Sequence, residues 1–378
     1  MTIKLRHLLA ASASVFAFNI TSATASTDKE IQATMRDASE SLSVLIPYAY
    51  DDARFTATNE QPRIRQHLAK LNTLFAKKTE LLGDDSDTTW ITLNVIQQHL
   101  ADTSKFYQAG YYATSQYLLT NIPALCTTCH IQDSAHSAIQ GILKRNQFAN
   151  DFSYGEYLFT IRNYKKSKQF FKSYLTDPDV QQSKLRSLKS LERLLTIELG
   201  VNQSISNARK LLSDYQQNLQ HLEIKEVTND WLSGLNAINT EANTYSDLEK
   251  MFNEWFSKSP SHSHEFILHE SKRPKAIWLR SKFFDLLKTP QHAEDTADTL
   301  YMLAVLSRIL GPDEPYSFAN LYLKQCVTQY PTTRSARHCL QEYKNHLSFY
   351  YGGSAGESVP DDLVKEYQKM KKSLESSK

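Results

Sequence analysis

The sequence predicts an all-α protein, an antiparallel four-helix bundle followed by a domain of helical hairpins. Glycine and proline are scarce, 10 and 11 among 378 residues, which is too few for a loop-rich all-β, collagen-like or disordered chain. Apolar residues recur along the chain at the spacing of amphipathic helices. The length fits two domains, each large enough to bury its own core.

The first 25 residues have the pattern of a secretory signal peptide. A basic stretch with Lys4 and Arg6 precedes an apolar run from Leu8 to Ile20, which ends in the small-residue pattern Ala23-Thr24-Ala25. The alternative, an uncleaved membrane anchor, is disfavoured because a helix needs roughly 20 apolar residues to cross a bilayer. We therefore expect cleavage near Ala25, localisation in the periplasm and no transmembrane anchor in the mature chain.

The charge balance argues against a nucleic-acid partner. The whole sequence carries 43 basic and 41 acidic residues, a formal net charge of +2. Removal of the leader takes away Lys4 and Arg6 and no acid, so the balance falls to 41 against 41. The mature chain then has no basic surplus for nucleic acid or for an anionic membrane surface.

Residues 26–150 are expected to form four helical segments with short connections. Breaks are predicted at 47–59, at 83–87 and near 103–105, and Pro123 is expected to open a fresh helical turn. One face of each of the first three segments is apolar: Ile31, Met35, Leu42, Leu45 and Ile46; Ile64, Leu68, Leu71, Leu74 and Phe75; Trp90, Leu93, Ile96, His99 and Leu100. Four helices joined in this way predict an antiparallel bundle.

Residues 151–378 are expected to form helical hairpins with three weak internal repeats. Each copy has a small residue followed four positions later by a bulky one: Ser167 and Phe171, Ala208 and Leu212, Ala319 and Leu323. These segments resemble tetratricopeptide repeats, in which the small residue lets neighbouring helices approach. Because the copies are irregularly spaced, we describe the domain as TPR-like.

Two stretches of the second domain lie outside the repeats. No repeat is recognised in 241–300, although 247–256 and 274–287 have helical patterns. Residues 350–356 hold three of the ten glycines. They lack the strand–loop–helix context and the Lys-Ser/Thr pair of a phosphate-binding loop, so we expect a surface loop.

The motif that carries chemistry is Cys126-Thr127-Thr128-Cys129-His130, which has the spacing of a covalent haem c site. On a helix, positions i, i+3 and i+4 share a face, so the two thiols and the imidazole point toward one object. Cys126 and Cys129 would form thioethers with the haem vinyl groups, and His130 would be the proximal iron ligand. One motif implies one haem.

Three other interpretations of the Cys126–Cys129 pair were weighed. A zinc site needs four ligands, and no second Cys pair or closely spaced His pair accompanies this one. A thioredoxin-like redox pair needs a βαβ context that the helical pattern does not provide. A structural disulfide between residues three apart is strained.

The position of this motif in the last helix of a four-helix bundle resembles class II c-type cytochromes, the cytochrome c-prime group, over residues 28–135. In that family a residue of the first helix covers the distal side of the haem, as a Met ligand in low-spin members and as an apolar residue in five-coordinate ones. The resemblance makes Met35 the candidate sixth ligand. His99 and His67 are the alternatives.

Cys326 and Cys339 are predicted to form a disulfide. They flank the turn at Pro331-Thr332-Thr333, so the two helices of a hairpin would bring them together. In an oxidising compartment such a pair is expected to be bonded.

Two weaker signals were also considered. Ser261-His262-Ser263-His264, with His269 nearby, lies between prolines and lacks the i, i+4 spacing of helical metal ligands, which favours a solvated loop over a metal site. No Ser-His-Asp arrangement or carboxylate pair stands out, so an electron carrier is favoured over an enzyme.

The leading hypothesis is a periplasmic monohaem cytochrome that transfers single electrons. Its helical-repeat domain would dock a periplasmic redox protein or a membrane-bound electron-transfer complex. One alternative is a five-coordinate haem protein that binds or senses NO or CO. The other is a scaffold or assembly protein that acts through the helical repeats.

Overall fold

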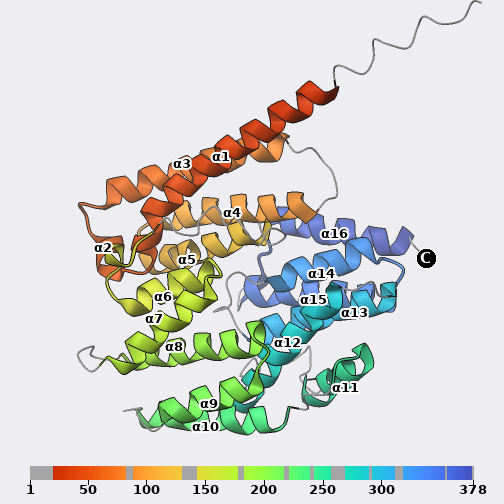
Figure 1. The fold of residues 1–378 in the computed structure, drawn as a ribbon. Helices are drawn as coiled ribbons and strands as arrows, with labels where there is room; N and C mark the ends of the chain where they lie inside the picture. Colours follow the sequence, from red (N-terminus) through yellow and green to blue (C-terminus); the bar gives the residue numbers. More distant parts are fainter. Residues whose placement is uncertain are drawn as a thin grey trace, which may run out of the picture.

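The computed structural model describes residues 20–81, 88–129, 143–177, 183–216, 221–238, 242–256, 269–288, 292–310, 318–353 and 356–376. At several helix ends, including residues 124–129, the description covers the backbone alone. The described chain is helical apart from connections and one two-stranded hairpin of two-residue strands, which confirms the all-α class (Figure 1).

Five helices make up the N-terminal part: α1 (Ile20–Ala49), α2 (Asp52–Thr56), α3 (Gln61–Leu81), α4 (Thr88–Gln108) and α5 (Tyr112–Cys129). The four long helices contact one another in a closed order, α1 with α3, α3 with α4, α4 with α5 and α5 with α1. Figure 1 shows that consecutive long helices run in alternate directions. Their shared core contains Leu42, Leu45, Ile64, Leu71 and Leu100, each at most 2% exposed.

Two of the predicted helix breaks are misplaced. The break expected near 103–105 is wrong because α4 continues to Gln108, and the turn falls at Gly110, whose φ of +82° suits glycine. The hydroxyl of Thr103 donates to the His99 carbonyl at 2.7 Å, so it bonds within the helix and does not end it. The break predicted at 47–59 contains the end of α1 at Ala49 and the short helix α2, so only its start at Pro47 is early. Pro123 lies inside α5 and does not open a new helical turn.

The core of the N-terminal helices continues past residue 150. Leu143, Phe148, Tyr154 and Tyr157 belong to the same apolar cluster as the long helices, and Tyr154 and Tyr157 lie on α6 (Asp151–Thr160). The 3-10 helix η1 (Arg145–Gln147) precedes α6. The hydroxyl of Ser153 donates to the Tyr50 carbonyl at 3.0 Å, which ties α6 to the end of α1.

The remainder of the chain is a succession of helices packed mainly on their neighbours in sequence (Figure 1). The elements are α7 (Tyr164–Thr176), α8 (Lys184–Thr196), the π-helix η2 (Ile197–Val201), α9 (Ile205–Gln216), α10 (Leu222–Asn236), α11 (Tyr245–Phe256), the 3-10 helix η3 (Glu270–Lys272), α12 (Arg273–Leu287), α13 (Ala293–Ile309), α14 (Phe318–Gln329), α15 (Arg334–Tyr351), β1 (Gly352–Gly353), β2 (Gly356–Glu357) and α16 (Asp361–Ser376). Helices α11 and α12 cover the two helical stretches expected within 241–300.

The small residues of the predicted repeats are buried as expected. Ser167, Ala208 and Ala319 are each 0% exposed. Beside Ser167, a Cβ added at Gly155 would meet the Phe171 ring at 3.0 Å, so α6 and α7 approach closely. This is the close helix packing that the repeat pattern predicts.

The Gly-rich stretch, predicted as a surface loop, contains a short β-hairpin whose residues Gly352 and Gly356 are exposed. Strands β1 and β2 pair antiparallel, Gly352 with Glu357 and Gly353 with Gly356. Gly356 has a φ of +107°, a conformation that side chains other than glycine rarely adopt. This hairpin connects α15 to α16.

Candidate haem-attachment site

The predicted attachment motif lies at the C-terminal end of α5. The helix ends at Cys129, so the backbones of Cys126 and Cys129 are one turn apart on a continuous helix. That spacing puts the two positions on one helix face. His130 falls outside the described residues.

Three other helices reach the end of the bundle that carries this motif. Because the long helices alternate in direction, the last turn of α5 lies at the same end as the start of α4, the end of α3 and the N-terminal half of α1 (Figure 1). Figure 1 also shows the N-terminal half of α1 diverging from α5 toward this end.

Met35 lies on α1, which runs antiparallel to α5, and two sets of polar contacts put it at a level between Thr120 and Cys129 of α5. Gln116 Nε2 on α5 donates to the Tyr48 carbonyl on α1 at 3.3 Å. Because the two helices are antiparallel, thirteen residues forward on α5 and thirteen residues back on α1 bring Cys129 level with Met35. A second route follows the polar contacts Glu40–Lys70 between α1 and α3, Asn72–Leu100 between α3 and α4, and His99–Leu118 between α4 and α5. Counted along this route, Met35 is level with Thr120. The two routes differ by nine residues of α5, and the second ends at Thr120, just before the half of the helix that carries the cysteines. The Met35 side chain is partly buried against the apolar cluster.

The His99 side chain is buried and is hydrogen-bonded to the backbone of α5. Its Nε2 lies 2.7 Å from the Leu118 carbonyl, and the residue is 2% exposed. Burial lowers the pKa of His99, and the Leu118 carbonyl and the Asp102 carboxylate oppose that shift. Leu118 precedes Cys129 by eleven residues, about 16 Å along the helix axis. Because its Nε2 already bonds to the Leu118 carbonyl inside the core, His99 is a poorer candidate for the iron ligand than Met35.

His67 is the weaker of the remaining candidates. Its Nδ1 is buried and has no hydrogen-bond partner among the described residues. Burial lowers the pKa of this imidazole, and the positive charges of Arg63 and Lys70 lower it further. The Lys70–Glu40 contact, 4.0 Å from Nζ to Oε2, fixes the register of α3 against α1. In this register His67 lies level with residue 43 of α1, which is eight residues or about 12 Å along the helix axis from Met35.

The described residues fit a haem in two respects. Neutral sulfur of Met and imidazole nitrogen of His are the axial ligands of low-spin c-type haems, and Met35 is available on the facing helix. The side chains on the inner face of α1 next to Met35 are small: Thr34, Ala38 and Ser41, each at most 9% exposed. Ser41 is fully buried, and its hydroxyl has no hydrogen-bond partner within the described chain.

No other metal site emerges from the described side chains. None of them form a group of three or more His, Cys, Asp or Glu suited to a metal ion. His262 and His264 lie outside the described residues. His269 is exposed, and its Nδ1 accepts a hydrogen bond from the Ser271 backbone N–H at 3.4 Å at the start of η3.

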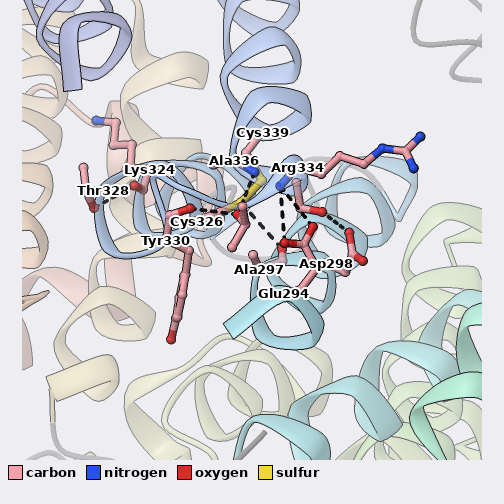
Figure 2. The surroundings of a disulfide bond; sticks show 12 residues. Glu294, Ala297, Asp298, Lys324, Cys326, Thr328, Tyr330, Arg334, Ala336 and Cys339 are labelled. Atoms are coloured by element: carbon pink, nitrogen blue, oxygen red, sulfur yellow. Dashed lines mark hydrogen bonds between the residues drawn. A yellow bond between two sulfur atoms is a disulfide. The ribbon is translucent and has the colours of Figure 1, made fainter. Parts of the chain in front are cut away.

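The predicted disulfide is present between α14 and α15 (Figure 2). Cys326 and Cys339 are bonded at an Sγ–Sγ distance of 2.13 Å, and both are fully buried. Thr333 caps α15 by accepting from the Ala336 N–H at 3.2 Å. The Glu294 carboxylate of α13 accepts from the Arg334 N–H at 3.0 Å, so three helices meet around the bond.

The sequence gives no sign of the buried ion pairs between helices. Arg193 Nε and Nη2 donate to the two carboxylate oxygens of Glu156 at 2.9 and 3.1 Å, and neither side chain is more than 10% exposed. The same guanidinium lies 4.5 Å from the centre of the Phe159 ring. The pair joins α6 to α8, and its members are 37 residues apart, beyond any periodic pattern.

Among the described residues, no helix combines the length and the apolar character that crossing a bilayer requires. Comparisons with protein-family models, with curated proteins and with solved structures gave no match.

Proposed function

We propose that this chain is a periplasmic monohaem c-type cytochrome that transfers single electrons. The observation that carries the proposal is the Cys126–Cys129 spacing at the end of α5, followed directly by His130, in a chain that begins with a signal-peptide pattern. The haem iron, when bound, supplies a one-electron couple. The cysteines would anchor the group, and His130 would bind the iron from the proximal side.

Met35 is the proposed distal ligand. The support is its place on α1, at a level that polar contacts put between Thr120 and Cys129 of α5, and its partial burial against the apolar cluster. A thioether held there by α1 would leave no open coordination position for a gas. Apolar neighbours would also keep water away, which favours a fixed coordination during electron transfer.

The helical region after residue 150 is proposed to dock the redox partner. The support is its TPR-like packing of small residues against large ones, as at Ser167, together with a size that exceeds what holding one haem requires. A periplasmic redox protein or a membrane-bound electron-transfer complex would be the partner.

Spectra of the full-length protein, produced with haem c maturation, test the proposal. The pyridine haemochrome spectrum should show one c-type haem per chain, and its absence would refute the haem assignment. Absorption and resonance Raman spectra, recorded with and without CO, should then show a six-coordinate, low-spin iron that binds CO poorly. A five-coordinate iron that takes up CO would favour the gas-binding alternative.

The ligand assignment needs a matched pair of methionine variants. Met35→Ala should convert the iron to a five-coordinate or water-bound form and admit CO. Met302→Ala is the control, because Met302 is 3% exposed in the separate core cluster of the second half. An unchanged haem spectrum in Met35→Ala, with the haem still bound, would exclude Met35 as the ligand.

A further inference from the structure

Helix α7 and the turn before it carry four exposed cations without an acidic partner. Arg162 lies in the turn, and Lys165, Lys166 and Lys172 lie on the outer side of α7, which contains no Asp or Glu. Within the part of the chain that the structure describes, none of these four side chains forms an ion pair or a hydrogen bond. We refer to Arg162, Lys165, Lys166 and Lys172 as the α7 cation face.

Three acids near α7 are paired with cations outside the α7 cation face: Glu156 with Arg193, Asp151 with Arg145, and Glu198 with Lys168. None of these three acids is therefore a partner of the α7 cation face, and Asp177, the C-cap residue, places one acid at the far end of the helix. This predominance of cations on α7 contrasts with the charge balance of the whole mature sequence, which is zero.

Folding gains nothing from these charges. Lys165 and Lys166 lie in the first turn of α7, where the positive end of the helix dipole repels cations. Lys165 and Lys172 are two turns apart, about 10 Å, so they repel each other at low ionic strength and are largely screened at physiological salt. The four charges are thus a cost to the free protein that an anionic partner would offset.

Arg162 also occupies a position that suits glycine. Its φ is +61°, and it follows the last residue of α6 and the capping Ile161. The Arg162 N–H donates to the Phe159 carbonyl at 3.0 Å and the Asn163 N–H to the Leu158 carbonyl at 2.8 Å, which is the Schellman pattern. Glycine would adopt this left-handed conformation without strain.

We propose that the α7 cation face binds the acidic surface of a partner protein. The inference rests on the docking role proposed above, and it adds the surface and the charge of the partner. Four unpaired cations favour a surface of complementary charge, which would speed association and fix orientation. A protein is favoured over a lipid surface because α7 presents no exposed aromatic or large aliphatic side chain for insertion into a bilayer.

A matched pair of charge-neutralising variants tests the proposal in the full-length mature protein. The probe is a fluorescent 20-residue poly-glutamate peptide, titrated by fluorescence anisotropy at several NaCl concentrations. The test variant combines Lys165→Gln, Lys166→Gln and Lys172→Gln. The matched control combines Lys365→Gln, Lys369→Gln and Lys372→Gln on α16, where the lysines are also exposed but share the helix with four acids, Asp361, Asp362, Glu366 and Glu375.

The test variant should bind the peptide about tenfold more weakly, with a shallower dependence on salt, while the control stays within about twofold of the wild type. Equal losses in both variants would show a non-specific response to net charge and would overturn the proposal. Unchanged binding in the test variant would also overturn it. So would a test variant that loses binding to phosphatidylserine vesicles and keeps its affinity for the peptide.

Arg162→Gly separates binding from folding. The substitution relieves the left-handed conformation and removes one charge, so it should raise the thermal midpoint and still weaken peptide binding. A weaker affinity accompanied by a lower midpoint would point to a structural role and count against the proposal. Haem spectra of the same samples distinguish failure of the haem assignment from failure of the docking surface, because the two readouts are independent.

Discussion

Reduction of the Cys326–Cys339 disulfide should loosen α14 and α15 selectively. The bond joins residues thirteen apart, and both sulfurs are fully buried in the cluster that α13, α14, α15 and α16 share. A loop of this length restricts the unfolded hairpin by about 3 kcal/mol. If the hairpin opens as a local unit, its opening free energy should fall by about that amount after reduction.

Hydrogen exchange followed by mass spectrometry measures this directly. A loss of about 3 kcal/mol corresponds to a rise of roughly 100-fold in the exchange of amides that open with the hairpin. Peptides from α14 and α15 should show the rise, and peptides from α9, which lies in another cluster, should not. Before reduction, Cys326 and Cys339 should not react with a thiol reagent in the denatured protein.

Two results would refute this reasoning. If exchange in α14 and α15 is unchanged after complete reduction, the native contacts hold the hairpin without help from the bond. If exchange rises equally in α9, then the chain opens only globally and the hairpin is not a local unit. A Cys326→Ala, Cys339→Ala double variant checks that the effect is not caused by the reductant.

Three further predictions concern stability. Gly234→Ala should destabilise the protein by about 1–3 kcal/mol in urea unfolding, because the new Cβ would lie 2.1 Å from a carbonyl oxygen of η3, whereas Gly200→Ala, with its nearest contact at 3.6 Å, should not; equal midpoints would contradict this. Burial and two nearby cations lower the pKa of His346 to about 3. As the pH falls from 6.5 toward 3, this imidazole therefore takes up a proton in the unfolded chain before it does so in the folded chain, and stability is lost over that range. His346→Gln should flatten the dependence of the thermal midpoint on pH. Arg193→Met should cost about 3 kcal/mol by leaving a buried carboxylate unpaired, and adding Glu156→Leu should recover part of the loss; a double variant as unstable as the sum of both changes would argue that the ion pair is not the cause.

The helices were predictable where one face is apolar over several turns. The apolar pattern from Ile64 to Phe75 predicts a helix, and these residues lie in α3. The cysteines that flank the turn at Pro331 predict a disulfide-linked hairpin, which α14 and α15 form. These features are local, so spacing along the chain is enough to find them. The attachment motif is local in the same sense.

The errors arise where tertiary contacts override local preference. Thr103 resembles a helix breaker, yet its hydroxyl bonds within α4 and its carbonyl accepts from Ser115 on α5 at 2.8 Å. Pro47 lacks a backbone donor, but the buried residues around it, including Ile46 and Tyr48, hold the last turn of α1 together. The partnership of Glu156 with Arg193 is likewise a product of the fold, since no periodicity links the two positions.

The continuation of the N-terminal core into α6 has a consequence for how the chain can be divided and made. A fragment that stops at residue 150 would leave out Tyr154, Tyr157 and Ile161, each at most 8% exposed, and would uncover the apolar surface that they shield. Such a fragment should aggregate, because it would expose this apolar surface to solvent. During vectorial synthesis, the first core is likewise incomplete until α6 has emerged, so the two halves of the molecule share a folding step.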